Sequence, residues 1–307
     1  MINSTQFSYI ILSAYADIKL IKYIFFMIFT VLYFFIICAN MLLIVVICLN
    51  RSLHEPMYMF LCSLFVNELF GSSGLFPFLL IQFLSDVHHI SNYLCFLQIF
   101  CVYSYAGVEF YNLAVMSYDR YVAICFPLQY KTRMTNNMVI MLIVVSWLPP
   151  LLMVTGTTML SFSLQLCGNV INKVYCDNYS VVKLACFDTS VNNIYGLIVS
   201  VGSIICALTL IFYTYIKIFK VCFSGSSETR EKAVNTCSPH LASLLNFSFG
   251  CLFEVSQSRF NMSNVPTMLG IFLSIYYFTC QPLFNPVLYG LKMSKIRNTC
   301  KHLLKKR

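Results

Sequence analysis

The stretch Tyr23–Leu49, YIFFMIFTVLYFFIICANMLLIVVICL, is an apolar run that contains no charged side chain. A helix rises about 1.5 Å per residue, so about 20 apolar residues cross the roughly 30 Å hydrocarbon core of a bilayer. This stretch is long enough to do so as one helix. It therefore decides the class of fold, and the chain is predicted to be a membrane protein.

Six more stretches of the chain are predicted to span the bilayer in the same way. They are Met57–Leu80, Cys95–Tyr121, Met138–Met159, Ile194–Cys222, Lys232–Gln257 and Thr267–Leu291. The sixth is the most polar, with Ser238, His240 and Asn246 inside it. A span tolerates such groups when they face neighbouring helices. The predicted fold is an all-α bundle of seven transmembrane helices.

The composition supports this prediction. The chain has 307 residues, of which 59% are hydrophobic and 10% charged. Soluble domains have about 45–50% apolar and about 25% charged residues. The formal net charge of +9 raises the possibility of nucleic acid binding. The basic residues lie in short segments between apolar runs, however, which is the pattern that sets membrane topology. We therefore expect no nucleic acid partner.

The basic residues also predict the orientation. Fifteen of the 20 Lys and Arg residues lie in the segments on one side of the predicted spans, and five on the other. The richer side is cytoplasmic by the positive-inside rule. This gives an extracellular N-terminus (1–22), a membrane domain (23–291) and a cytoplasmic tail (292–307). The glycosylation sequons at Asn3 and Asn178 both fall on the predicted outer side, which is consistent with a plasma-membrane protein.

The tail from Lys292 to Leu304 is predicted to be a short amphipathic basic helix. Such a helix lies along the inner membrane surface, where anionic lipids attract Lys and Arg. The alternative is a disordered basic tail.

Most of the 15 cysteines lie inside predicted spans, where they are small apolar fillers. Four lie on the predicted outer side: Cys95, Cys167, Cys176 and Cys186. An even number in an oxidising compartment predicts two disulfides. Four cysteines allow three pairings, and their spacing does not choose among them.

Two short motifs lie at matching inner ends of predicted spans. Asp119-Arg120-Tyr121 ends the third, and Asn285-Pro286-Val287-Leu288-Tyr289 ends the seventh. With Cys95 at the start of the third span, these motifs resemble the rhodopsin-like class of G-protein-coupled receptors. The resemblance implies signalling to a heterotrimeric G protein, without catalytic residues or a cofactor.

Longer blocks narrow the resemblance to the odorant receptors, over nearly the whole chain. The third span closes with Met116–Cys125 and then Pro127–Tyr130. Other matching residues are Pro56-Met57-Tyr58, Lys232-Ala233, Thr236-Cys237, His240-Leu241, Pro282 and Tyr289-Gly290-Leu291. Asn67-Glu68-Leu69 and Gly74-Leu75-Phe76-Pro77 resemble the fish branch of that family. The chain departs from the commoner mammalian pattern at Glu68, Ser248 and Gln281, which leaves the ligand class open.

The resemblance implies roles for several residues. Asp119 and Arg120 are expected to form a latch that opens on activation and lets Arg120 face a G protein of the kind that raises cyclic AMP. The alternative is a charge pair that only anchors the helix. His240 is expected to take part in the movement of the sixth span, or to be a satisfied polar residue.

Glu68 and Glu109 are acidic residues deep inside predicted spans. An intramembrane carboxyl is costly to bury and is a functional hypothesis by default. The resemblance implies that both line a sodium site near Asn285. Alternatively, each is protonated and hydrogen-bonded to a neighbouring helix.

A ligand site is predicted on one face of the third span, in its outer half. Ile99, Val102, Tyr103, Ala106 and Gly107 follow a helical spacing, and the last two leave room. Ordinary helix packing also favours small residues. The stripe contains no acid, so an amine site is not expected, and a small-molecule odorant is the expected partner.

The sequence disfavours three other functions. An intramembrane serine protease would use Gly71-Ser72-Ser73-Gly74, but no His lies in a position to activate that serine. A transporter would show inverted repeats, and none is visible. A rhodopsin-like receptor for a peptide or lipid is disfavoured by the blocks around Asp119 and His240.

Overall fold

The structure is a computed structural model that describes residues 7–15, 21–224, 227–259 and 267–305. Its long helices are α1 (Lys22–Leu49), α2 (Pro56–Leu84), α3 (Asn92–Cys125), α5 (Asn136–Phe162), α7 (Ser190–Ser224), α8 (Ser227–Arg259) and α9 (Thr267–Lys292). The shorter helices are α4 (Tyr130–Arg133), α6 (Asn178–Val182) and α10 (Ser294–Lys305), with 3-10 turns η1 (Ser13–Tyr15), η2 (Arg51–Leu53) and η3 (Pro127–Gln129). The strands are β1 (Tyr9–Leu12), β2 (His89–Ser91) and β3 (Val170–Ile171).

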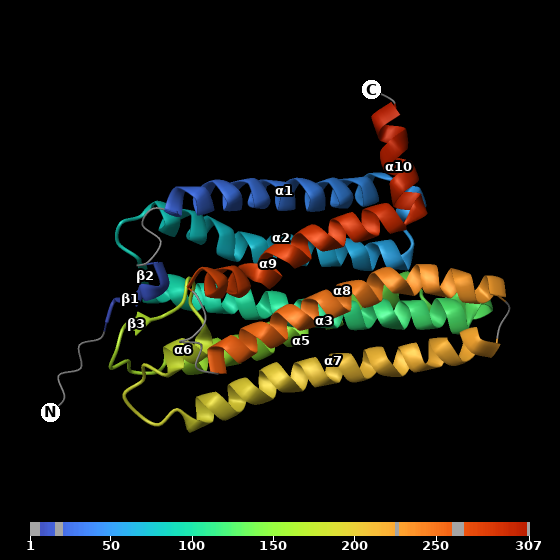
Figure 1. Ribbon diagram of the computed structural model, residues 1–307. Helices are drawn as coiled ribbons and strands as arrows, with labels where there is room; N and C mark the ends of the chain where they lie inside the picture. Colours follow the sequence, from blue (N-terminus) through green and yellow to red (C-terminus); the bar gives the residue numbers. More distant parts are fainter. Residues whose placement is uncertain (1–6, 16–20, 225–226, 260–266, 306–307) are drawn as a thin grey trace.

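The seven long helices run side by side as one bundle, which confirms the predicted fold (Figure 1). Each predicted span lies inside one of them, and the helices extend a few residues further at most ends. Two of these extensions have a local cause, because Ser91 and Thr135 cap the starts of α3 and α5 by accepting backbone N–H groups.

Five helices in the described part of the chain, α1, α2, α3, α5 and α7, are long and apolar enough to cross a membrane. Large apolar side chains point outward from them, as Phe34 and Leu152 do at 62% exposure each. In water such a surface would be unfavourable, whereas hydrocarbon solvates it. The sixth helix, α8, is more polar and directs His240, Ser243 and Leu244 inward, where they are buried.

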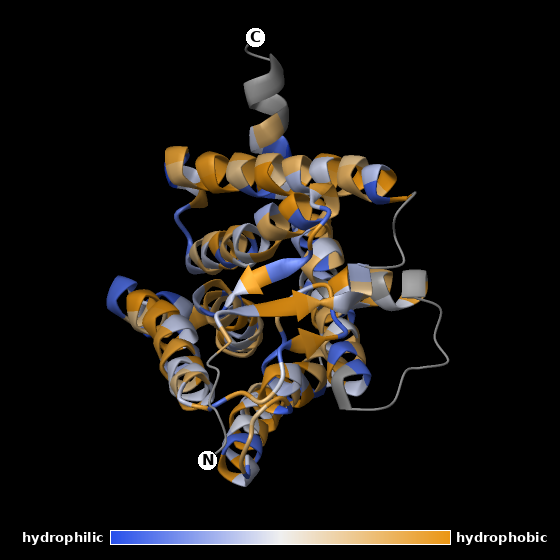
Figure 2. Ribbon diagram, turned by 90° about the vertical axis from the view of Figure 1, so that its left-hand side faces the viewer, coloured by the Kyte–Doolittle hydropathy of each residue, from blue (hydrophilic) through white to orange (hydrophobic). Residues whose placement is uncertain are grey.

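The two ends of the bundle differ. A three-stranded sheet of order β2-β1-β3 lies across one end, here called the sheet end (Figure 2). Strand β1 pairs antiparallel with β2 and parallel with β3, and it buries Ile10 and Leu12 while exposing Tyr9 and Ile11. The helix α10 leaves the opposite end, here called the tail end, at a steep angle to the bundle (Figure 1).

The helix α10 confirms the predicted tail helix. The structure has a helix over Ser294–Lys305 and not the alternative, a disordered tail. Its first turns are held to the bundle, because Ile296 is fully buried and Lys295 pairs with Glu55 at 2.5 Å.

Candidate functional site

The predicted ligand face of α3 lines a cavity of about 160 Å³ near the sheet end. All five predicted residues contribute to its wall: Ile99, Val102, Tyr103, Ala106 and Gly107. The other walls come from α5, α6, α7 and α8. Gly107 has a second role, since a Cβ at this position would lie 2.9 Å from Pro150 Cβ, so α3 and α5 approach closely here. Most of the wall is apolar, and an apolar cavity of about 150 Å³ can hold a molecule of the size of benzene.

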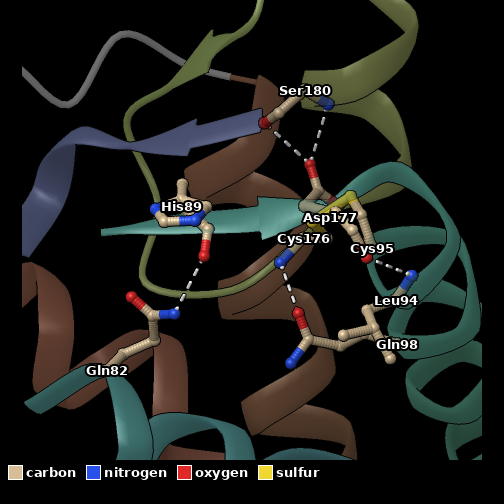
Figure 3. The surroundings of a disulfide bond; sticks show 9 residues. Gln82, His89, Leu94, Cys95, Gln98, Cys176, Asp177 and Ser180 are labelled. Atoms are coloured by element: carbon tan, nitrogen blue, oxygen red, sulfur yellow. Dashed lines mark hydrogen bonds between the residues drawn. A yellow bond between two sulfur atoms is a disulfide. The ribbon is translucent and has the colours of Figure 1, made fainter. Parts of the chain in front are cut away.

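A disulfide fixes the side of this cavity that faces the sheet end. The structure joins Cys95 of α3 to Cys176 and, separately, Cys167 to Cys186, which settles the pairing that spacing left open. Gln98, one turn along α3, accepts a hydrogen bond from the backbone N–H of Cys176 at 2.8 Å (Figure 3). The next residue, Asp177, is thereby held over the bundle and caps α6 by accepting from Ser180 N at 3.0 Å.

Two carboxyl groups reach the cavity from outside α3. Asp177 accepts a hydrogen bond from the Tyr103 hydroxyl at 2.8 Å. Glu254 of α8 pairs with Lys173 of the loop before α6 at 3.1 Å. The α3 stripe itself contains no acid, as its sequence shows. The loop before α6 and the helix α8 add two carboxyl groups to the wall once the helices pack together.

A second polar cluster lies at the centre of the bundle, around Glu68 and Glu109, which are both fully buried. Glu68 accepts hydrogen bonds from the Tyr105 hydroxyl at 3.0 Å and from Asn285 Nδ2 at 2.5 Å. Glu109 accepts from Asn67 Nδ2 at 2.9 Å and from Asn285 Nδ2 at 3.2 Å. Asn285 therefore bridges the two carboxyl groups.

The same cluster explains why a polar residue is present at Gln281, a position where the chain departs from the usual odorant receptor pattern. Its amide nitrogen donates to Glu109 Oε1 at 3.2 Å and to Ser243 Oγ at 2.9 Å, and Asn246 donates to its oxygen at 2.6 Å. Gln281 thus ties α9 to α3 and α8. Sequence reasoning noted this residue only as an anomaly, because its partners come from distant parts of the chain.

The residues of the predicted latch lie together near the tail end. Arg120 pairs with Asp119 through its Nη2 and also donates from Nε at 3.0 Å. The other oxygen of Asp119 accepts from the Tyr130 hydroxyl of α4 at 2.7 Å. Burial, helped by Asp119, raises the pKa of Tyr130, which keeps it a hydroxyl donor. Tyr130 was not predicted as a site residue, although its block was recognised.

His240 of α8 connects this helix to α7 and α3. Its Nδ1 accepts from the Tyr215 hydroxyl of α7 at 2.7 Å, and its Nε2 donates to the Leu113 carbonyl of α3 at 2.8 Å. One neutral tautomer satisfies both bonds. Since both ring nitrogens are occupied, His240 activates no serine. This agrees with the rejection of a protease.

The motif residues of α9 divide between these clusters. Asn285 lies in the central one, while Tyr289 is 1% exposed and packs among buried apolar residues nearer the tail end. Pro286 lies inside the helix. Tyr121, the last residue of the other motif, packs edge-on against Phe126.

The two predicted glycosylation sites have different outcomes. Asn3 lies outside the described residues. Asn178, the first residue of α6, is 8% exposed. A glycan on a residue this buried would have to displace the wall of the cavity, so the sequon at Asn178 is not an accessible acceptor in this fold.

Comparisons with known proteins fit this geometry. The solved structure of squid rhodopsin superposes with a TM-score of 0.77, covering 96% of this chain and 85% of that one at 16% identity. The fold is therefore that of the rhodopsin-like receptors.

A family model described as olfactory receptor matches residues 29–307. Olfactory receptor 4E2 of Mus musculus is 33% identical over 100% of this chain and 98% of its own length. Olfactory receptor 10A3 of Homo sapiens is 32% identical over 89% of this chain and 87% of its own. The chain belongs to the olfactory receptor family. It is a multi-pass plasma-membrane receptor that signals through a G protein and is not an enzyme.

Proposed function

We propose that this receptor binds a small odorant in the cavity beside α3 and then activates a heterotrimeric G protein that raises cyclic AMP. The observation that carries the proposal is the pairing of a mainly apolar cavity near the sheet end with the Asp119–Arg120–Tyr130 cluster near the tail end of one bundle. Ile99, Val102, Tyr103, Ala106 and Gly107 would contact the odorant. A peptide or lipid ligand is not favoured by the family.

The orientation and the membrane contacts belong to the same proposal. The N-terminus (1–22) and the sheet end would lie outside the cell, and the tail (292–307) inside. Residues 23–291 would then form the membrane domain. The helix α10 would rest on anionic lipid through Lys295 and Arg297. The proposal also includes a glycan at Asn3. It further assigns the chain to the fish branch of the family, on the basis of Asn67–Leu69 and Gly74–Pro77.

Activation would follow from the contacts of Arg120. Its guanidinium is charged at any accessible pH and is held by Asp119. Release of that pair, with movement of α8 through His240 and of α9 through Asn285, Pro286 and Tyr289, would turn Arg120 toward the G protein. The G protein would then stabilise the open form of the receptor, because it binds that form more tightly than the closed form.

The test is cyclic AMP measured in cells that express the full chain, exposed to mixtures of amines, amino acids, bile acids, nucleotides and volatiles. We expect at least one mixture to raise cyclic AMP. Arg120→Ala should abolish the response at equal surface level, because the G protein loses its contact. A response that persists in this variant would contradict the proposed role of Arg120.

We also propose that Glu68 and Glu109 hold a sodium ion. Among the described residues, neither carboxyl group has a basic partner, so two adjacent negative charges need a proton or a cation. Two buried oxygens beside them, Asn67 Oδ1 and Ser72 Oγ, have no hydrogen-bond partner in the described part of the chain. Oxygen ligands of this kind suit a hard cation.

Replacing sodium by choline at constant ionic strength tests this site. We expect the concentration of agonist for half-maximal response to shift severalfold in the unchanged receptor. Glu109→Gln should remove the shift, because a single remaining carboxyl balances its charge with a proton. Asp188→Asn, which changes an exposed carboxyl at the sheet end, is the control. Equal sodium dependence in Glu109→Gln would exclude the ion site.

A further inference from the structure

The charges that line the cavity are all of one sign. Its described wall residues include two carboxyl groups, Asp177 and Glu254, and no Lys, Arg or His. Lys173, the ion-pair partner of Glu254, is not a wall residue. A ligand in this cavity therefore meets two carboxyl groups and no basic side chain among the described wall residues. Such a wall attracts cations and repels carboxylates.

Among the described residues, the wall leaves two buried acceptors without donors, and one buried donor, Asn192 Nδ2, without an acceptor. Glu254 uses Oε1 for Lys173, and its buried Oε2 makes no hydrogen bond of normal length among the described residues, although the Tyr175 hydroxyl lies near enough to stabilise the carboxylate. Asn178 is 8% exposed, and its Oδ1 has no hydrogen-bond partner among the described residues. Leaving a buried acceptor unpaired is unfavourable, and more so when the group is charged. Both atoms are suited to a ligand that donates N–H bonds.

Aromatic rings complete the polar part of the wall. Tyr103, Tyr175 and Tyr179 all line the cavity together with the two acids. The face of an aromatic ring attracts a cation within about 6 Å of its centre. One example is already present, since Lys183 Nζ lies 4.4 Å from the centre of the Tyr179 ring. The remaining wall is mainly apolar, with Ile99, Val102 and Val154. It also carries hydroxyl and amide groups, those of Thr157, Thr158, Asn192, Asn193, Ser200 and Ser203.

We propose that the ligand of this receptor is a small amine, with a protonated amino group and a short apolar body. The amino group donates to Glu254 Oε2 and Asn178 Oδ1 beside Asp177, and the body packs against α3 and α5. This inference rests on the proposed function, because it names the class of ligand for the same cavity. The acids come from α8 and the loop before α6, not from α3.

Three six-carbon compounds separate the possible ligand classes: hexylamine, 1-hexanol and hexanoic acid. They share size and body and differ in charge. Binding is measured on the purified full-length receptor as a shift of its thermal unfolding temperature, and signalling as cyclic AMP in cells. We expect hexylamine to bind at least tenfold more tightly than the other two. Equal or tighter binding of the alcohol or the acid would overturn the inference.

The two measurements separate this inference from the proposed function. Binding of the amine without any rise in cyclic AMP would support the amine site and argue against the proposed G protein coupling. Cyclic AMP raised only by the alcohol or the acid would support the receptor function and overturn the amine site. If none of the three binds, the amine site is also overturned.

A pair of variants gives opposite expected results. Glu254→Gln keeps the shape of the side chain and should weaken hexylamine binding about ten- to a hundredfold, with 1-hexanol unaffected. Lys173→Gln removes the competing cation and should keep or raise hexylamine affinity. Loss of hexylamine binding in both variants would mean that the ion pair only holds the loop in place, and would overturn the inference.

Discussion

Gly71 has a structural function in the packing of α2 against α3. A Cβ added at this position would overlap the ring of Tyr105, which is fully buried and donates its hydroxyl to Glu68. Gly74, in the same motif, similarly accommodates Cys101, whose Cβ would lie 2.7 Å from the added atom. The run Gly71-Ser72-Ser73-Gly74 therefore lets α2 and α3 approach closely, as small residues do in membrane helices.

Gly71→Ala is expected to destabilise the receptor by about 1–3 kcal/mol, because Tyr105 or the helices must move to admit the methyl group. Thermal unfolding of the purified receptor measures this effect. Gly196→Ala is the matched control, since it lies in a helix with nothing within 4 Å of the added Cβ. An unchanged unfolding temperature for Gly71→Ala would mean that the ring shifts at no cost.

Among the secondary-structure elements, the small sheet has the clearest connection to the cavity. Strand β1 ties the N-terminal segment to β2 and β3, and Tyr15 after it donates to the Val174 carbonyl at 2.7 Å. Val174 lies two residues before Cys176 of the disulfide. The N-terminal segment thus supports the loop that carries Asp177, and disturbing it should loosen the outer wall of the cavity.

His88 makes this support dependent on pH. Its ring stacks on Tyr15 with centres 4.9 Å apart, and burial, together with Lys22, lowers its pKa below the ordinary value. Protonation therefore favours states in which His88 is exposed. The stability that it contributes is present above a pH of about 6.5 and is lost as the pH falls below that value.

Hydrogen exchange of residues 9–15 at pH 7.5 and at pH 5.5 should show less protection at the lower pH. His88→Gln should reduce the difference between the two values. Comparing the two proteins at each pH cancels the intrinsic change in exchange rate. The same pH effect in both proteins would assign it to another group.

Over the whole molecule, polar contacts follow one another from the cavity toward the tail end. Phe110 and Cys251 line the cavity, and Glu109 beside Phe110 bonds to Gln281 and Asn285. Ser243 donates to Asn285 at 2.8 Å. Ser243 lies one turn of α8 from His240, on its C-terminal side. These contacts give a physical connection between the two ends.

Asp119→Asn should raise basal cyclic AMP severalfold at equal surface level. The latch loses a charged hydrogen bond to Arg120, a loss of about 1.5–3 kcal/mol that favours the open form. Glu55→Gln is the matched control, because it breaks an exposed ion pair with Lys295 near the same end of the bundle. Unchanged basal signalling in Asp119→Asn would leave the pair as a simple anchor of α3.

The sequence predicted the helices well, because lipid requires long apolar runs and such runs are visible without knowledge of the fold. It also placed Asp119, Arg120 and Asn285 correctly within their helices. The disulfide pairing remained open, since spacing alone allows three arrangements. The sheet was not predicted, because its strands are short and their partners are far apart in the chain.

By itself, then, the amino-acid sequence determined the bundle, its tail helix and the family, since each depends on local periodicity or on a run of adjacent residues. Only the tertiary structure decided that Asp177 and Glu254 face the same cavity as the α3 stripe, and that Gln281 joins the cluster at Glu109. These residues are brought together by helix packing and by the Cys95–Cys176 disulfide. The chemical character of the site is therefore a property of contacts between distant segments, which no single stretch of the chain contains.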